Sequence, residues 1–222
     1  MDRQTFSDRA EAGRLLGQRV SVLLATAPAV EAPLVLGLPR GGVVVAAHAA
    51  VALGVPVEVF VARKIGHPRQ PEYGLGAIAE GGEPVFDELS LAHAGLVATD
   101  LGPVVAAERQ ELARRVAEYR PGRDLPPLAG RTVVLVDDGV ATGVTARAAL
   151  RALRSRGPGR LLFAAPVAAR QSVAELAAEA DEIVVLASPA GFGSVGRWYV
   201  AFPQVSDAEV VALLTPPGRR SR

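Results

Sequence analysis

Cysteine is absent from the 222-residue sequence, and aromatic residues make up only 5% of it. Without a thiol, the chain cannot form a disulfide, a thiolate nucleophile or a zinc site built on sulfur. An excess of one charge is also missing, because 24 basic residues stand against 23 acidic ones. The chain therefore lacks the strongly positive net charge that is typical of nucleic-acid-binding proteins, so we expect no nucleic-acid partner.

Long apolar runs are missing as well. The first residues, MDRQTFSDRAEAGRLLG, are charged where a signal peptide needs an apolar stretch, and no later apolar run reaches the length that spans a bilayer. We therefore expect a cytoplasmic protein without a membrane partner.

The residues that are present favour a single globular domain spanning 1–222, since half of them are hydrophobic. Strand-like apolar runs alternate with helical patterns, which predicts an α/β fold with a doubly wound, mostly parallel sheet and covering helices. The predicted strands are 34–38, 57–61, 132–136, 161–166 and 183–187. The predicted helices are 7–25, capped by Ser7, and 43–53, 102–119, 144–155 and 172–180.

Two segments depart from this alternation. Residues 66–99 are rich in Gly and Pro and contain two short apolar runs around Glu80-Gly-Gly-Glu83, which predicts a flexible loop or hairpin excursion. Residues 215–222 are rich in Pro, Gly and Arg, so we expect a frayed tail.

The most informative segment is TVVLVDDGVATGVTA, residues 132–146, in which a strand ends in two carboxylates and a Gly/Thr loop leads into a helix. Ligands of α/β proteins bind at such carboxyl ends of strands. Amides at the helix start and the hydroxyls of Thr142 and Thr145 suit a phosphate, and Asp137 and Asp138 suit two vicinal hydroxyls. Together they indicate a ribose 5-phosphate, although the acidic pair alone is also found in receiver domains.

Other phosphate-binding classes do not fit this segment. The loop lacks the lysine of a Walker A motif, and no GxGxxG fingerprint of a dinucleotide-binding domain follows the predicted strands 34–38 or 132–136.

Residues 133–145, VVLVDDGVATGVT, resemble the signature of type I phosphoribosyltransferases, whose substrate is 5-phosphoribosyl 1-pyrophosphate (PRPP) with magnesium. The resemblance implies that Asp137 and Asp138 bind the ribose hydroxyls. It assigns the 5-phosphate to the loop formed by Gly139, Val140, Ala141, Thr142, Gly143, Val144 and Thr145. It implies no direct metal ligand from the protein, since Mg2+ is carried with PRPP near the acidic pair.

Two further segments fit this family. Gly37–Gly42, GLPRGG, is similar to the pyrophosphate loop and makes Pro39, Arg40, Gly41 and Gly42 candidates for binding pyrophosphate. Arg63 and Lys64, in ARKI, are similar to the Arg-Lys pair of orotate and adenine phosphoribosyltransferases, and would neutralise pyrophosphate as catalytic residues together with Asp137 and Asp138. By itself the first segment is more often a simple tight turn, and the second could equally be two surface cations.

The resemblance also implies roles for the variable parts. Residues 66–99 take the place of the flexible loop that closes over the substrate. Residues 188–205 take the place of the hood that holds the acceptor, with Trp198, Tyr199 and Phe192 as candidates for stacking on a planar base. The same aromatics could instead anchor the C-terminal segment.

The expected reaction is transfer of the 5-phosphoribosyl group from PRPP to a nitrogen acceptor such as a nucleobase, with release of pyrophosphate, as in nucleotide metabolism. Ala141 stands where 6-oxopurine enzymes carry an acidic residue, which disfavours hypoxanthine and guanine as acceptors.

With GLPRGG, ARKIG, GAIAEGG and a late WY, the chain most resembles a bacterial group of predicted phosphoribosyltransferases of unsettled acceptor. The alternative is a PRPP-binding regulatory protein with little or no transferase activity. Dimers are common in the family, which allows a homodimer.

Overall fold

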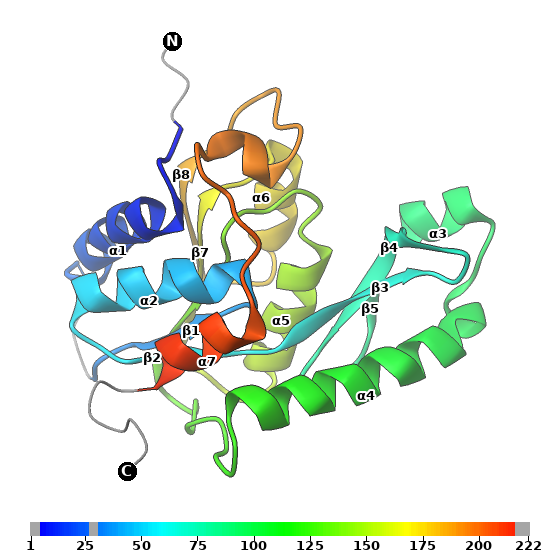
Figure 1. The fold of residues 1–222 in the computed structure, drawn as a ribbon, viewed down its shortest axis with the longest axis horizontal. Helices are drawn as coiled ribbons and strands as arrows, with labels where there is room; N and C mark the ends of the chain where they lie inside the picture. Colours follow the sequence, from blue (N-terminus) through cyan, green and yellow to red (C-terminus); the bar gives the residue numbers. More distant parts are fainter. Residues whose placement is uncertain (1–4, 27–30, 216–222) are drawn as a thin grey trace.

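The computed structural model describes residues 5–26 and 31–215. Its main sheet has five strands in the order β2-β1-β6-β7-β8, and every neighbouring pair is parallel. The strands are β1 (Leu34–Gly37), β2 (Val57–Val59), β6 (Thr132–Val136), β7 (Arg160–Val167) and β8 (Glu182–Ala187). The predicted α/β fold with a parallel sheet is confirmed (Figure 1).

Helices cover both faces of this sheet. The helices α1 (Arg9–Leu24) and α2 (Gly41–Leu53) share one core with Val134 and Leu162, whereas α5 (Val144–Arg154) and α6 (Arg170–Leu176) share another with Leu135 and Phe163. Successive residues of a strand point to opposite faces, so a strand that is buried on both sides must be apolar throughout. This explains the uninterrupted apolar runs in the sequence.

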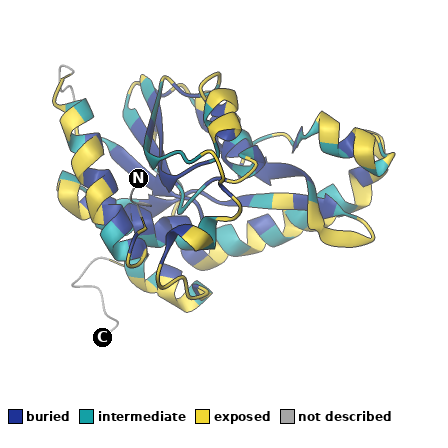
Figure 2. Ribbon diagram, turned by 90° about the horizontal axis from the view of Figure 1, so that it is seen from above, coloured by how far each residue is buried: buried dark blue, intermediate teal, exposed yellow. Residues whose placement is uncertain are grey.

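An arm formed by residues 62–119 projects from this sheet (Figure 1). It holds an antiparallel sheet of β3 (Ala62–His67), β4 (Gln70–Ala79) and β5 (Val85–Phe86), followed by α3 (Glu88–Ala94), the 3-10 helix η1 (Ala98–Leu101) and α4 (Gly102–Tyr119). Residues 66–99 are therefore built of regular elements, and the hairpin already begins at residue 62. The far end of the arm is mostly exposed (Figure 2).

Two segments near opposite ends of the described chain, residues 6–7 and 199–201, pair with each other. Phe6 forms a parallel bridge with Tyr199, and the backbone N–H groups of Val200 and Ala201 donate to the carbonyls of Phe6 and Ser7 at 2.8 and 2.9 Å. The segment 188–205 contains the 3-10 helix η2 (Val195–Trp198) and leads into α7 (Asp207–Leu214), which was not predicted.

The first residues of α1 and α7 are set by side chains that cap the helix N-terminus, which the sequence analysis did not identify. The side chain of Asp8, rather than that of Ser7, accepts the N–H of Glu11 and begins α1 at residue 9. Ser206 and Glu209 form a reciprocal capping box that begins α7. Of the predicted tail 215–222, residues 216–222 lie outside the described residues.

No single helix in the described ranges is both long and apolar enough to cross a bilayer. The helices at 88–94 and 98–119 reach that length and composition only when taken together across a bend of 85°.

Candidate functional site

The site lies where the order of the main sheet reverses. From β1 the chain passes through α2 to β2 on one side, whereas β6 continues to β7 and β8 on the other, so the carboxyl ends of β1 and β6 flank the switch point. The loop 38–40 follows β1 and the loop 137–143 follows β6. The structure therefore brings together the two loops that the resemblance assigned to pyrophosphate and to ribose 5-phosphate.

Close contact between these loops depends on glycine. The N–H of Leu38 donates to the carbonyl of Val136 at 2.9 Å. A Cβ atom on Gly42 would lie 2.8 Å from the same carbonyl oxygen, and one on Gly41 would lie 1.8 Å from Oδ2 of Asp138. Any larger residue at either glycine would push the loops apart.

The loop after β6 presents a free helix start. Gly143 adopts a left-handed conformation with φ of 75°, and no side chain caps α5, which begins at Val144. Val140 ties the loop to the neighbouring strand, because its N–H donates to the carbonyl of Val167 at 2.9 Å. Ser172 of α6 braces the loop from behind by donating to the carbonyl of Ala141 at 2.6 Å. The first N–H groups of α5 are thus held in place to bind an anion.

A cavity of about 470 Å3 opens beside this loop, between α5, α6 and the beginning of α3. Thr142 lines it together with Arg147, whose Nη2 donates to the carbonyl of Phe86 at 3.2 Å. Arg147 therefore links α5 to the arm next to the loop.

The acidic pair at the end of β6 is electrostatically strained. Burial raises the pKa of Asp137 well above its usual range, and the charge of Asp138 raises it further. Burial also raises the pKa of Asp138, while the guanidinium of Arg9 opposes this rise. The pair therefore favours ligands that donate hydrogen bonds or bring positive charge.

Arg9 contacts this pair although no sequence pattern indicated it. Its Nε lies 2.8 Å from Oδ2 of Asp138, across 129 positions of the chain. The hydroxyl of Tyr199 donates to the backbone carbonyl of Asp138 at 2.5 Å. Both ends of the described chain therefore converge on one aspartate.

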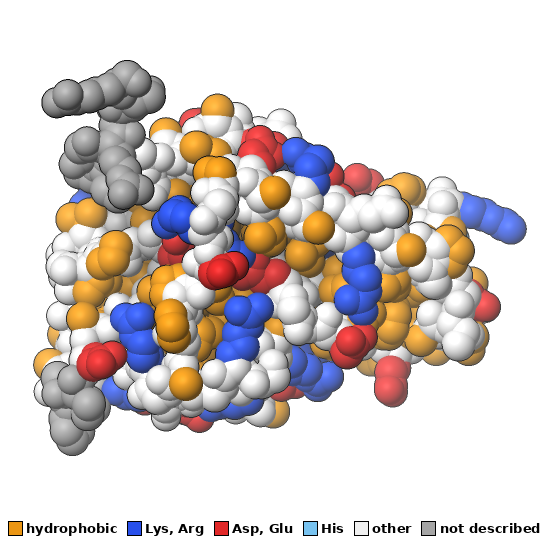
Figure 3. Space-filling view, turned by 90° about the horizontal axis from the view of Figure 1, so that it is seen from below, with side chains coloured by type: hydrophobic (Ala, Val, Ile, Leu, Met, Phe, Trp, Pro, Cys, Tyr) orange, Lys and Arg blue, Asp and Glu red, His pale blue; other side chains and the backbone are white. Residues whose placement is uncertain are grey.

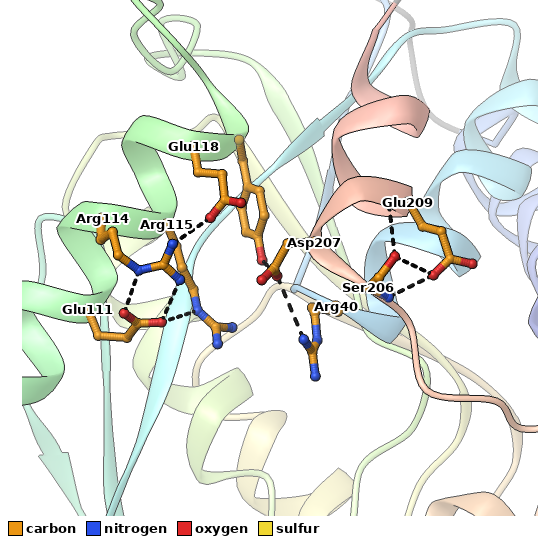
Figure 4. Close-up of polar contacts among 9 residues, drawn as sticks. Arg40, Glu111, Arg114, Arg115, Glu118, Ser206, Asp207 and Glu209 are labelled. Atoms are coloured by element: carbon orange, nitrogen blue, oxygen red, sulfur yellow. Dashed lines mark hydrogen bonds and ion pairs between the residues drawn. The ribbon is translucent and has the colours of Figure 1, made fainter.

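Arg40 stands at the beginning of α2, after a cis peptide bond between Pro39 and Arg40. Its Nη1 lies 3.8 Å from Oδ1 of Asp207 in α7, which also accepts the hydroxyl proton of Tyr119 in α4. Figure 4 shows the contact between Arg40 and Asp207. The guanidinium is only half-buried, so it can leave Asp207 for an anionic ligand.

Arg63 and Lys64 lie on the arm, and their described contacts are not with the acidic pair. Nε of Arg63 donates to Glu108 of α4 at 2.7 Å, and Nζ of Lys64 donates to the carbonyl of Glu72. Both side chains line a cavity of about 540 Å3 between the hairpin and α4. Their predicted catalytic role stays a prediction that needs these contacts to change.

The three predicted stacking residues of the segment 188–205, Phe192, Trp198 and Tyr199, are buried rather than open to a ligand. Trp198 and Phe192 stack with ring centroids 6.4 Å apart, and the indole N–H donates to the carbonyl of Phe192 at 3.0 Å. Tyr199 packs with them against Phe6 and Val167. This packing favours the anchoring role over stacking on an acceptor. Phe202, whose ring lies 4.9 Å from that of Tyr199, is more exposed.

The described residues contain no group of three or more His, Cys, Asp or Glu side chains that could hold a metal ion. Basic and acidic side chains are interspersed on the face shown in Figure 3.

Comparison with known proteins identifies relatives of this chain. The family model described as "Phosphoribosyl transferase domain" matches residues 25–192. Two Mycobacterium tuberculosis proteins, "Putative phosphoribosyl transferase Rv0571c" of strain H37Rv and "Putative phosphoribosyl transferase MT0597" of strain CDC 1551, are each 46% identical over 209 residues, which is 94% of this chain. The chain spans about half the length of these relatives, 46% of each. The crystal structure of TT1426 from Thermus thermophilus is 43% identical, with a TM-score of 0.76 over 95% of this chain and 97% of that one.

Proposed function

The chain belongs to the phosphoribosyltransferase family, and we propose that it transfers the 5-phosphoribosyl group of PRPP to a nitrogen acceptor and releases pyrophosphate. The observation that carries this proposal is the meeting of the loops 38–40 and 137–143 at the switch point of the sheet. One loop presents a guanidinium, and the other presents two carboxylates and an open helix start.

Each part of the site suits one part of PRPP. The amides at the beginning of α5 would bind the 5-phosphate, and Asp137 and Asp138 would accept hydrogen bonds from the ribose hydroxyls. Arg40, released from Asp207, would bind the pyrophosphate next to the reacting carbon. The chain would thus hold the sugar at both ends and neutralise the leaving group.

The donor set suits magnesium that arrives with the substrate. Mg2+ is usually held by one or two carboxylates together with substrate phosphates and water. Two adjacent carboxylates next to a pyrophosphate loop suit that pattern, and the described residues offer no larger cluster. When bound, the ion would supply positive charge to the leaving pyrophosphate.

The first test is calorimetric titration of the protein with PRPP in the presence and absence of Mg2+. We expect binding that needs Mg2+ and that is lost when Asp137→Asn and Asp138→Asn are combined. Absence of binding by the wild-type protein would refute the proposal.

The second test is release of pyrophosphate with a panel of nucleobases and related nitrogen acceptors. We expect turnover with at least one acceptor and its loss in Lys64→Met, because Lys64 would neutralise the leaving group when the arm rearranges. Tight PRPP binding without turnover on any acceptor would instead favour the regulatory protein.

A further inference from the structure

We propose that Arg9 is a positioning residue for Asp138, because it holds one oxygen of this carboxylate and leaves the other for a sugar hydroxyl. The inference rests on the proposed function, since it assigns a role within the ribose-binding pair. It adds a residue from outside the segment 25–192 that matches the family model.

Three contacts hold the guanidinium of Arg9 in one orientation. Nε donates to Oδ2 of Asp138 at 2.8 Å, and Nη1 donates to the carbonyl of Pro203 at 2.7 Å. The ring of Phe202 lies against the guanidinium, with 3.7 Å between Cζ and the ring centroid. Only 9% of the side chain is exposed. Such a buried arginine is oriented far more closely than a surface cation.

The backbone around Arg9 is held by the same terminal segments. Phe6 and Ser7, just before α1, accept N–H donors from Val200 and Ala201. This pairing brings Phe202 and Pro203 over the beginning of α1. Arg9 is therefore placed by contacts that need both residues 6–7 and residues 200–203.

In each aspartate of the acidic pair, one carboxylate oxygen accepts a hydrogen bond from the protein and the other does not. Oδ1 of Asp137 accepts the backbone N–H of Asp138 at 2.8 Å, and Oδ2 of Asp138 accepts Arg9. Within the described parts of the chain, no hydrogen bond uses the second oxygen of either carboxylate. One acceptor oxygen per aspartate remains for the two hydroxyls of a diol.

Charge explains why a cation is needed at this position. Sugar hydroxyls are neutral and cannot offset two adjacent, partly buried carboxylates. Arg9 supplies one positive charge next to Oδ2 of Asp138. Gly41 lies so close to the same oxygen that a Cβ atom there would overlap it, so Oδ2 is enclosed between Arg9 and the loop that contains Gly41. The opposite oxygen then faces the sugar.

The test compares two ligands that differ only in the diol. Ribose 5-phosphate and 2,3-dideoxyribose 5-phosphate are titrated by protein NMR into the wild-type protein, Arg9→Met, Arg9→Lys and Arg19→Met. Arg19→Met is the matched control, because Arg19 is exposed on the same helix. Melting temperatures of all four proteins are measured alongside.

We expect Arg9→Met to weaken binding of ribose 5-phosphate about ten-fold, the effect of losing one well-placed hydrogen bond to a charged group. Binding of the dideoxy sugar should stay within two-fold, and Arg19→Met should bind both like the wild type. Arg9→Lys keeps the charge and should recover part of the preference for ribose.

Other outcomes overturn the inference. Unchanged or tighter binding of ribose 5-phosphate by Arg9→Met would make Arg9 a bystander or a competitor of the sugar. An equal loss for both ligands would show that Arg9 acts on the phosphate. If Arg9→Met does not fold, the measurements on Arg9→Lys decide the question. A lysine variant that prefers ribose 5-phosphate over the dideoxy sugar as strongly as the wild type would refute a positioning role for the guanidinium of Arg9. A wild-type protein that binds neither sugar would refute the proposed function itself, and the role of Arg9 with it.

Discussion

Replacing Gly41 by alanine tests the contact between the two loops most directly. A Cβ atom at this position would lie 1.8 Å from Oδ2 of Asp138 and 2.8 Å from Nε of Arg9. Real Cβ contacts are essentially never shorter than 3.0 Å, so the carboxylate would have to move by about 1 Å or more. We therefore expect Gly41→Ala to displace Asp138 without altering any charge.

The size of the effect follows from the hydrogen bond that Asp138 would make to a ribose hydroxyl. Hydrogen bonds to charged groups contribute about 1.5–3 kcal/mol, which corresponds to roughly a 10- to 100-fold change in Kd. Gly41→Ala should weaken PRPP binding by this factor. It should also lower the melting temperature, because Asp138 loses its alignment with Arg9.

Calorimetric titration with PRPP and Mg2+ measures this effect, and Gly102→Ala is the matched control. A Cβ atom on Gly102 meets nothing within 4 Å, and its φ of −48° is helical, so alanine fits there. Alanine at this helical position is expected to leave the affinity unchanged and to stabilise the fold by up to about 1 kcal/mol. A Gly41→Ala protein that binds PRPP within two-fold of the wild type would refute the close approach of the loops.

Three further predictions concern stability. Burial raises the pKa of Glu80 to about 7 in spite of its ion pair with Arg120. The stability that the folded state gains from protonating this carboxyl is therefore fully present below about pH 4.5 and is lost as the pH rises through 7. Glu80→Gln should flatten this part of the profile of urea unfolding against pH; an unchanged slope between pH 5 and 7.5 would contradict the assignment. Leu135→Ala, on the central strand β6, should lower the free energy of unfolding measured with urea by about 2–5 kcal/mol, whereas the same change at the more exposed Leu15 should lower it far less. Similar losses at both sites would contradict the burial of Leu135. Asp87→Ala removes the N-cap of α3 and should cost about 0.5–2 kcal/mol, seen as faster amide exchange in α3; unaltered exchange there would argue against the cap.

Much of the fold could be predicted because its signals are local. The strand β6 and the helix α4 were predicted with the bounds that the structure shows, 132–136 and 102–119. A central parallel strand must be apolar on both faces, and a long helix shows its period over several turns, so both leave a contiguous pattern. The short helices α3 and α7 were missed, since seven or eight residues carry little periodicity and are stabilised by packing on other elements.

The candidate site divides in the same way. The sequence by itself located the Gly/Thr loop and the acidic pair, because one strand, one turn and one helix start hold them within nine consecutive residues, 137–145. Only the tertiary structure decided that Arg9 contacts Asp138, that Asp207 lies beside Arg40, and that Phe192, Trp198 and Tyr199 are buried. Each of these contacts joins segments that are more than a hundred positions apart in the sequence, such as Phe6 and the aromatic residues around Trp198. A pairing of that kind depends on how whole elements pack, and it has no periodicity or spacing that a sequence could display.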